Sequence, residues 1–84
     1  MYYVYVLQSL KDKEFYIGLT NNLSRRIKEH NEGLVKSTKS RGLFNLVYYE
    51  GSLNRYDAVR REKFLKTGSG KQYIKNRIKH YLKS

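Results

Sequence analysis

The sequence contains no cysteine, no proline and no tryptophan, and only one methionine. The absence of cysteine excludes disulfide bonds, cysteine-based zinc sites and thiol nucleophiles, so the fold must be stabilised by packing alone. No proline, six glycines and no internal repeat argue against linkers and low-complexity segments. No apolar run is long enough for a signal peptide or a membrane helix. We therefore expect a cytoplasmic protein.

Acidic residues are also scarce. Eighteen Lys and Arg stand against seven Asp and Glu, which gives a formal net charge of +11. Such an excess of positive charge is typical of proteins that bind nucleic-acid phosphates, and less often of proteins that bind acidic membrane surfaces. With 39% hydrophobic residues the chain can still bury a core. At 84 residues, we expect one domain spanning 1–84.

The pattern of β-branched and aromatic residues predicts strands over 2–7 and 15–19, joined as a hairpin, and a third strand over 45–50 that ends at Gly51-Ser52. Alternation separates the two faces of the hairpin. The register that pairs apolar with apolar residues puts four residues on one face, namely Tyr3, Tyr5, Tyr16 and Gly18.

Three helices are predicted between and after these strands. The first runs from Leu23 to Glu32 and ends at Gly33, and residues 35–42 form a basic loop. The second begins after Asn54 and continues to Thr67, where Gly68 stops it, and the third covers 71–82. The order ββαβαα indicates an α+β fold with a small three-stranded antiparallel sheet flanked by helices.

Several polar residues occupy positions where apolar ones are expected. The inward stripe of the first helix is Leu23, Arg26, Ile27, His30 and Leu34. That of the second helix is Ala58, Val59, Glu62 and Leu65. The apolar seam of the third helix consists of Ile74, Ile78 and Tyr81. A buried charge without a partner costs several kcal/mol, so the inward Arg, His and Glu should either pair or form a site. A carboxylate, a guanidinium and a phenol or imidazole suit chemistry on phosphate.

Two tripeptides carry a specific resemblance. Tyr3-Val4-Tyr5 is followed by Tyr16-Ile17-Gly18, with ten residues between Tyr5 and Tyr16. This pair resembles the signature of the GIY-YIG endonuclease superfamily, although Tyr3 and Val4 stand where the family has Gly and Ile. The family fold, a small three-stranded sheet with flanking helices, matches the predicted order over essentially the whole chain. In its short length the chain resembles the stand-alone YhbQ-type members of the family. Those members are also similar to the N-terminal nuclease domain of UvrC.

The resemblance implies roles for six residues. Tyr5 and Tyr16 would be the motif tyrosines, one of which acts as general base or positions water, and Arg26 would stabilise the scissile phosphate. His30 would assist one turn later, and Glu62 would be the single carboxylate that binds Mg²⁺ or Mn²⁺. Asn76 is a weaker candidate for the family's C-terminal asparagine, because only its residue type supports it.

Simpler interpretations exist for each of these residues. Tyrosines at alternating strand positions are usually half-buried packing residues, and we assign Tyr2, Tyr48 and Tyr49 to that class. His30 could be a structural histidine, Glu62 could form a buried ion pair with Arg26, and we expect His80 at the surface. The joint occurrence of the matched positions in order favours a site.

These observations predict a divalent-metal-dependent endonuclease that hydrolyses phosphodiester bonds, with DNA favoured over RNA, low sequence specificity and a role in repair or recombination. Flanking phosphates would contact Arg25, Lys28, Lys39 and Arg41. A separate protein could supply targeting, no membrane partner is expected, and the oligomeric state stays open. The alternative is a non-catalytic basic DNA- or RNA-binding module that retains the fold.

Overall fold

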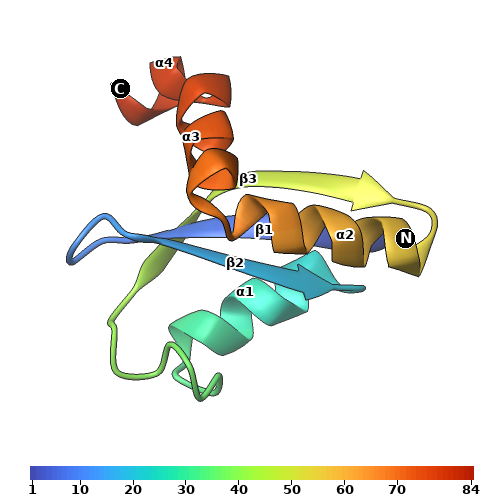
Figure 1. Ribbon diagram of the computed structural model, residues 1–84. Helices are drawn as coiled ribbons and strands as arrows, with labels where there is room; N and C mark the ends of the chain where they lie inside the picture. Colours follow the sequence, from blue (N-terminus) through green and yellow to red (C-terminus); the bar gives the residue numbers. More distant parts are fainter.

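The sheet at the centre of the fold is antiparallel, with the strand order β2-β1-β3. In the computed structural model, which describes residues 1–84, α1 covers one face of this sheet, and α2 and α3 lie on the other (Figure 1). The elements are β1 (Tyr2–Ser9), β2 (Phe15–Thr20), α1 (Leu23–Asn31), β3 (Phe44–Ser52), α2 (Arg55–Leu65), α3 (Gly68–Arg77) and α4 (Lys79–Leu82). The predicted α+β fold with a three-stranded antiparallel sheet is confirmed, with one additional short helix at the end.

The register of the hairpin places the motif tyrosines as predicted. Tyr5 lies opposite Gly18, and Leu7 lies opposite Tyr16. Directly opposed residues in an antiparallel pair point to the same face, so both motif tyrosines face α1. The pairing of β1 with β3 is antiparallel as well, with an irregularity between Val6 and Leu7.

The two faces of the sheet bury two separate apolar clusters. On one face, Val4, Val6 and Ile17 pack with three residues of α2 and α3, namely Ala58, Leu65 and Ile74. On the other face, Tyr5, Leu7 and Phe44 are buried with Leu23 and Ile27 of α1 packed against them. Because the central strand β1 is buried on both faces, its position relative to α1 and α2 is fixed by packing on both sides.

Helices α1, α2 and α3 begin at side-chain caps. Asn22 accepts a hydrogen bond from the backbone N–H of Arg25, and Asn54 does the same for Tyr56 at the start of α2. Thr67 caps α3 through the N–H of Gly70. Each cap satisfies one of the donors left free in the first turn of a helix, and typically stabilises it by about 1 kcal/mol.

Some helix boundaries and inward positions differ from the prediction. Gly68 does not stop α2: that helix ends at Leu65, and Gly68 is the first residue of α3, which begins earlier than residue 71. The third helix also breaks at Ile78, whose φ of −117° lies outside the helical region, so Tyr81 is 54% exposed rather than part of an apolar seam. Leu34, predicted inward, is 69% exposed because α1 ends three residues before it and Gly33 turns the chain with φ +75°.

None of the helices combines the length and the apolar character that crossing a membrane would require.

Candidate active site

The ring of Tyr5 lies over the backbone of Gly18 on the neighbouring strand. A Cβ atom placed on Gly18 would overlap the hydroxyl and the adjacent ring carbons of Tyr5. The glycine of the second motif is therefore required because it leaves room for the tyrosine of the first. Tyr5 is 1% exposed, and its hydroxyl is directed over β2, the edge strand of the sheet.

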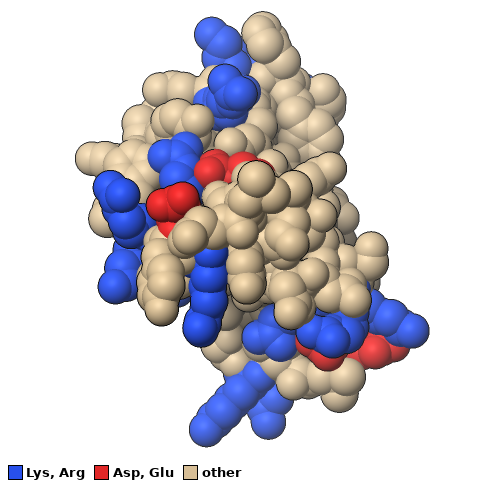
Figure 2. All heavy atoms as spheres, turned by 90° about the vertical axis from the view of Figure 1, so that its right-hand side faces the viewer, with Lys and Arg blue, Asp and Glu red and all other residues tan.

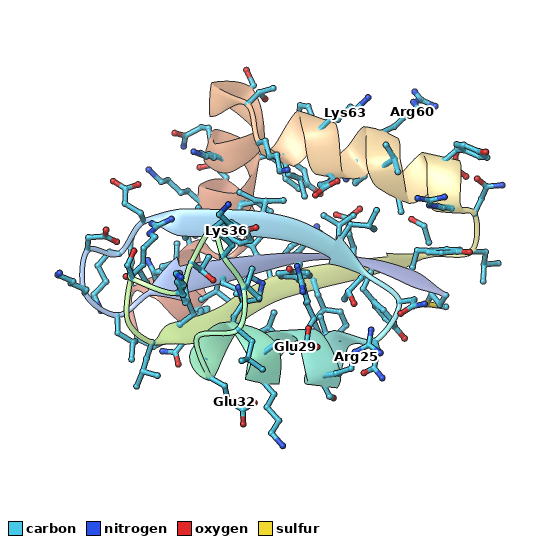
Figure 3. The ribbon with its side chains drawn as sticks, turned by 90° about the horizontal axis from the view of Figure 1, so that it is seen from below. Arg25, Glu29, Glu32, Lys36, Arg60 and Lys63 are labelled. Atoms are coloured by element: carbon cyan, nitrogen blue, oxygen red, sulfur yellow. The ribbon has the colours of Figure 1, made fainter.

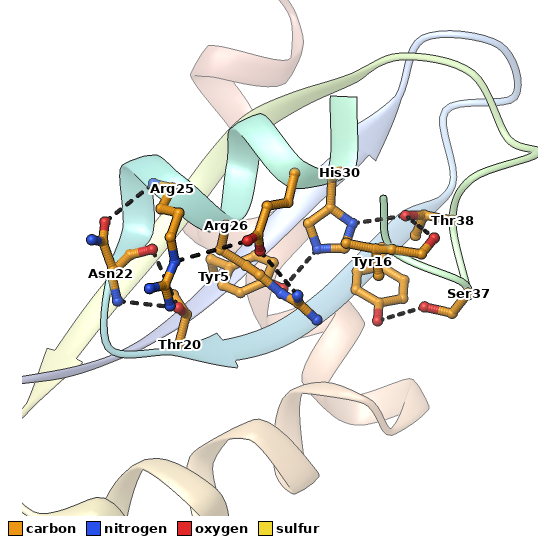
Figure 4. A network of polar contacts seen from close by, with 11 residues as sticks. Tyr5, Tyr16, Thr20, Asn22, Arg25, Arg26, His30, Ser37 and Thr38 are labelled. Carbon is orange, nitrogen blue, oxygen red and sulfur yellow. Dashed lines mark hydrogen bonds and ion pairs between the residues drawn. The ribbon is translucent and has the colours of Figure 1, made fainter. Parts of the chain in front are cut away.

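His30 joins Tyr5 to the loop that follows α1. The Tyr5 hydroxyl lies 2.8 Å from Nε2 of His30, and Nδ1 of His30 lies 2.8 Å from the hydroxyl of Thr38 (Figure 4). Burial, and then the positive charge of Arg26, lower the pKa of His30 below its ordinary value. The imidazole is therefore neutral at pH 7 and able to accept a proton.

Tyr16 occupies a more open position on the same face. Its hydroxyl shares a hydrogen bond of 3.0 Å with Ser37, and its ring packs edge-on against His30 with centroids 5.1 Å apart. Both motif tyrosines therefore contact the same imidazole, but only Tyr5 is hydrogen-bonded to it.

Arg26 lies on α1, and its side chain is next to Tyr5 of β1. Its Nη1 donates a hydrogen bond to Oε1 of Glu29 at 3.2 Å, and its side chain is 36% exposed (Figure 4). Burial raises the pKa of the Tyr5 phenol, and the interaction with Arg26 offsets part of that rise. A guanidinium that is half-exposed and next to a phenol can still turn towards a phosphate.

Glu62 lies on α2, which packs on the face of the sheet opposite to α1. Its negative charge contributes to the raised pKa of Tyr5, after burial and the opposing effect of Arg26. Its carboxylate pairs with Lys66 at 3.3 Å, whereas Arg26 pairs with Glu29, so the buried Arg26–Glu62 pair considered from the sequence is not formed. Figure 3 shows α2 displaced beyond the β2 edge of the sheet.

The surroundings of Glu62 suit one hydrated divalent cation. Mg²⁺ keeps several water ligands and is usually held by one or two carboxylates together with substrate phosphates. The Glu62 side chain is 20% exposed, and its partner Lys66 is a mobile surface cation at 55% exposed. No three His, Asp or Glu side chains form a cluster that could enclose a metal. A cation here would therefore rely on Glu62, water and phosphate.

The other predicted residues lie outside this cluster. Asn76 is exposed on α3, where it accepts a hydrogen bond from Gln72 at 3.3 Å, and no contact joins it to the tyrosines or to Arg26. Arg25, Lys28 and Lys39 are exposed, and Arg41 is half-buried, 3.9 Å from Asp12. Figure 3 shows Arg25 on α1 and Lys36 in the following loop, with Arg60 and Lys63 projecting from the outer side of α2.

The cluster is buried at Tyr5 and His30, and it reaches the surface at Arg26 and Glu62, whose side chains are partly exposed. None of the three hollows on the molecular surface is lined by Tyr5, Tyr16, Arg26 or Glu62. Figure 2 looks onto the end of the sheet where α1 and α2 begin, and it shows Lys and Arg side chains spread over that face with few acidic ones among them.

Sequence reasoning missed two residues of this cluster. Ser37 and Thr38 belong to the segment 35–42, which was predicted to be a solvated basic loop. Thr38 is completely buried, and each of the two hydroxyls reaches a side chain of the cluster. A hydroxyl residue within a polar loop carries no periodic signal, so nothing in the sequence could have separated Thr38 from its exposed neighbours.

Comparison with known protein families identifies the family of this chain. The model of the GIY-YIG catalytic domain matches residues 1–77. The chain belongs to the GIY-YIG family. The GIY-YIG domain defines a family of nucleases, which generally use divalent metals, so membership places the cluster of Tyr5, Tyr16, Arg26, His30 and Glu62 in a nuclease fold.

The relatives of this GIY-YIG chain are small proteins of similar length. It is 48% identical over 67 residues to UPF0213 protein CPE1444 of Clostridium perfringens, covering 79% of this chain and 71% of that one. It is 41% identical over 75 residues to UPF0213 protein SH2523 of Staphylococcus haemolyticus, covering 88% and 90% of the two chains. The solution NMR structure of UPF0213 protein BH0048 from Bacillus halodurans matches with a TM-score of 0.54 at 36% identity, over 88% and 82% of the chains.

Proposed function

We propose that this single-domain protein is a divalent-metal-dependent endonuclease that hydrolyses phosphodiester bonds of DNA with low sequence specificity. The observation that carries the proposal is the convergence of Tyr5, His30 and Arg26 at the open β2 edge, with the charge of Glu62 acting on the same phenol. A nick, a flap or a single strand would suit a surface site that has no element for reading base edges. Such substrates fit a role in repair or recombination.

In this proposal the residues divide the work of an in-line attack by water on phosphorus. Tyr5 or Tyr16 orients the water and takes its proton, and His30 accepts a proton from the phenol. Arg26 donates hydrogen bonds to the phosphate oxygens, where negative charge increases in the transition state. The P–O bond to the leaving nucleoside breaks, and the leaving oxygen is protonated by solvent.

Glu62 would hold the divalent cation. When bound, Mg²⁺ or Mn²⁺ supplies positive charge to the phosphate and to the leaving oxygen. Arg25, Lys28, Lys39 and Arg41 would contact flanking phosphates, and Asn76 stays a weaker candidate for the site. A separate protein would supply any targeting.

The test is cleavage of supercoiled plasmid and of single-stranded and flapped oligonucleotides, with Mg²⁺ or Mn²⁺ and with chelator. We expect metal-dependent cleavage that Glu62→Ala abolishes and that Glu32→Ala, which removes an exposed carboxylate of the α1 end, retains. If wild type and Glu62→Ala are equally inert while both still bind, the protein is a binding module and the proposal is wrong.

A second experiment separates catalysis from binding at Arg26. We expect Arg26→Ala to abolish cleavage and to leave most of the affinity intact, because binding is spread over many cations. Arg60→Ala is the matched control, since Arg60 projects from the outer side of α2 (Figure 3). An equal loss of cleavage and affinity in Arg26→Ala would make Arg26 a binding residue only.

A further inference from the structure

A buried chain of three hydrogen bonds runs from the candidate active site into the loop after α1. The Tyr5 hydroxyl contacts Nε2 of His30 at 2.8 Å, and Nδ1 of His30 contacts the Thr38 hydroxyl at 2.8 Å. The Thr38 hydroxyl then donates to the backbone carbonyl of Val35 at 3.5 Å. His30 is 1% exposed and Thr38 is 0% exposed, so bulk water does not compete for the hydrogen bond between them.

The hydrogen bonds can be satisfied together in only one direction. The Val35 carbonyl can only accept, so it takes the single hydroxyl hydrogen of Thr38. The Thr38 oxygen then accepts from Nδ1–H of His30. A neutral imidazole has one N–H, so Nε2 is the acceptor and the Tyr5 hydroxyl donates to it.

The opposite direction of these hydrogen bonds would cost free energy. If Nε2–H of His30 donated to Tyr5, the phenolic hydrogen would need another acceptor, and His30 is the one group that shares a hydrogen bond with the Tyr5 hydroxyl in the structure. Arg26, whose side chain interacts with Tyr5, carries only donors. A buried hydroxyl without an acceptor costs about 1–3 kcal/mol.

We propose that Thr38 is a positioning residue: it fixes His30 as the Nδ1–H tautomer and thereby makes Tyr5, rather than Tyr16, the tyrosine that takes the proton of the attacking water. The assignment of the tautomer stands on the hydrogen bonds alone, whereas the role of Tyr5 rests on the proposed nuclease function. Tyr16 has no such acceptor, because its hydroxyl is bonded to Ser37 and not to an imidazole nitrogen.

In the proposed step, each proton and each electron pair has a stated donor and acceptor. As the water oxygen forms its bond to phosphorus, its proton passes to the Tyr5 oxygen, and the original phenolic proton moves to Nε2 of His30. The resulting imidazolium keeps its Nδ1–H bond to Thr38. The P–O bond to the leaving oxygen breaks with its electron pair, solvent protonates that oxygen, and His30 later returns the proton through Tyr5 to solvent.

The tautomer can be measured without any substrate. In ¹⁵N-labelled protein, long-range ¹H–¹⁵N correlations of the imidazole rings distinguish Nδ1–H from Nε2–H, and the chain has two histidines, so a His80→Gln variant assigns the signals. We expect Nδ1–H for His30 in wild type and in Thr38→Ser, and loss of that preference in Thr38→Val. Nε2–H in wild type overturns the inference whatever the activity.

Cleavage rates test the consequence. We expect Thr38→Val to lose roughly tenfold or more in rate, and Thr38→Ser to stay within about threefold of wild type, because the serine hydroxyl restores the acceptor. Ser40→Ala, at an exposed position of the same loop, is the control and keeps the wild-type rate. Amide spectra establish that each variant is folded.

The possible failures are distinguishable. A Thr38→Val protein with an altered tautomer and an unchanged rate overturns the positioning role. If Thr38→Val does not fold, the wild-type spectrum still decides the tautomer. Wild-type protein that has the Nδ1–H tautomer but cuts no nucleic acid contradicts the proposed function and leaves the assignment of Thr38 intact.

Discussion

The packing of Tyr5 against Gly18 shows how single residues determine the site. The aromatic ring covers the glycine, which leaves no space for any side chain, and the hydroxyl is thereby held against His30. The two family motifs are thus one structural unit, in which the second motif supplies the surface on which the first motif's tyrosine lies.

A methyl group at position 18 should therefore damage the site. In Gly18→Ala, the Tyr5 ring must move although it is buried, so we expect a loss of about 1–3 kcal/mol in unfolding free energy, as for other overpacked cores. The Tyr5–His30 bond should be lost as well. Urea unfolding measures the loss of stability, and plasmid cleavage measures the effect of the lost Tyr5–His30 bond on activity. Gly51→Ala is the control, because its Cβ would meet the flexible end of Met1. Equal behaviour of the two variants would contradict this account.

The buried imidazole should make stability depend on pH. The pKa of His30 is lower in the folded protein than its ordinary value of 6.5, so the unfolded chain binds the proton more readily. The stabilisation is fully present above pH 6.5 and declines as the pH falls from there towards the folded pKa. We expect urea midpoints to fall between about pH 7.5 and pH 5.5. The fall should be smaller in His30→Gln and unchanged in His80→Gln. A pH dependence that persists in His30→Gln would contradict this assignment.

At the scale of elements, α2 and α3 owe their arrangement to close backbone contact. A Cβ on Gly70 would overlap the backbone of Phe64 and Leu65, so the first turn of α3 lies directly on the last turn of α2. α2 is also tied to β3, since Glu50 of β3 accepts a hydrogen bond from Arg61 of α2 at 2.8 Å. These contacts hold α2, and with it Glu62, against the sheet.

Two glycines of α3 should respond in opposite ways to the same substitution. Gly70→Ala should lower the free energy of unfolding by about 1–3 kcal/mol, because the backbone of α2 cannot move aside as a side chain can. Gly68→Ala meets nothing within 4 Å and improves helix propensity, so it should be neutral or stabilise by up to about 1 kcal/mol. Urea unfolding of both variants measures the difference, and comparable losses would contradict the contact.

At the scale of the whole molecule, the charge of +11 divides into two parts. Arg26 lies inside the hydrogen-bonded cluster, whereas most Lys and Arg side chains are exposed on helices and loops (Figure 2). Exposed cations neutralise phosphates and release counterions, which makes affinity depend on salt rather than on base sequence. Binding and catalysis should therefore be separable.

The salt dependence of binding tests which cations bind phosphates. Anisotropy titrations of a labelled DNA duplex between roughly 50 and 200 mM salt should give a linear plot of log affinity against log salt. We expect the slope to fall by about 1 for each of Lys28, Lys39 and Arg41 that is replaced by Gln and contacts a phosphate. Replacement of Arg26, which contacts a single phosphate in the proposal, should lower the slope by no more than about 1. A slope that does not respond to any of the three would show that binding uses another surface.

The sequence alone determined the strands, their register, the helix after the hairpin and the membership of the family. These features depend on alternation, on caps such as Asn22 and on spacing between motifs, which are local properties of the chain. They also placed Tyr5, Tyr16 and Gly18 on one face.

Only the tertiary structure decided which side chains meet. The partners of Arg26 and Glu62 proved to be Glu29 and Lys66, and Thr38 proved to be buried although it lies in a basic loop. The physical reason is that hydrogen bonds and ion pairs depend on distances between elements, which packing on both faces of β1 fixes and which no periodicity records. The order of the hydrogen bonds from Tyr5 through His30 to Thr38 was decided in the same way, together with the carbonyl of Val35 that the loop presents to Thr38.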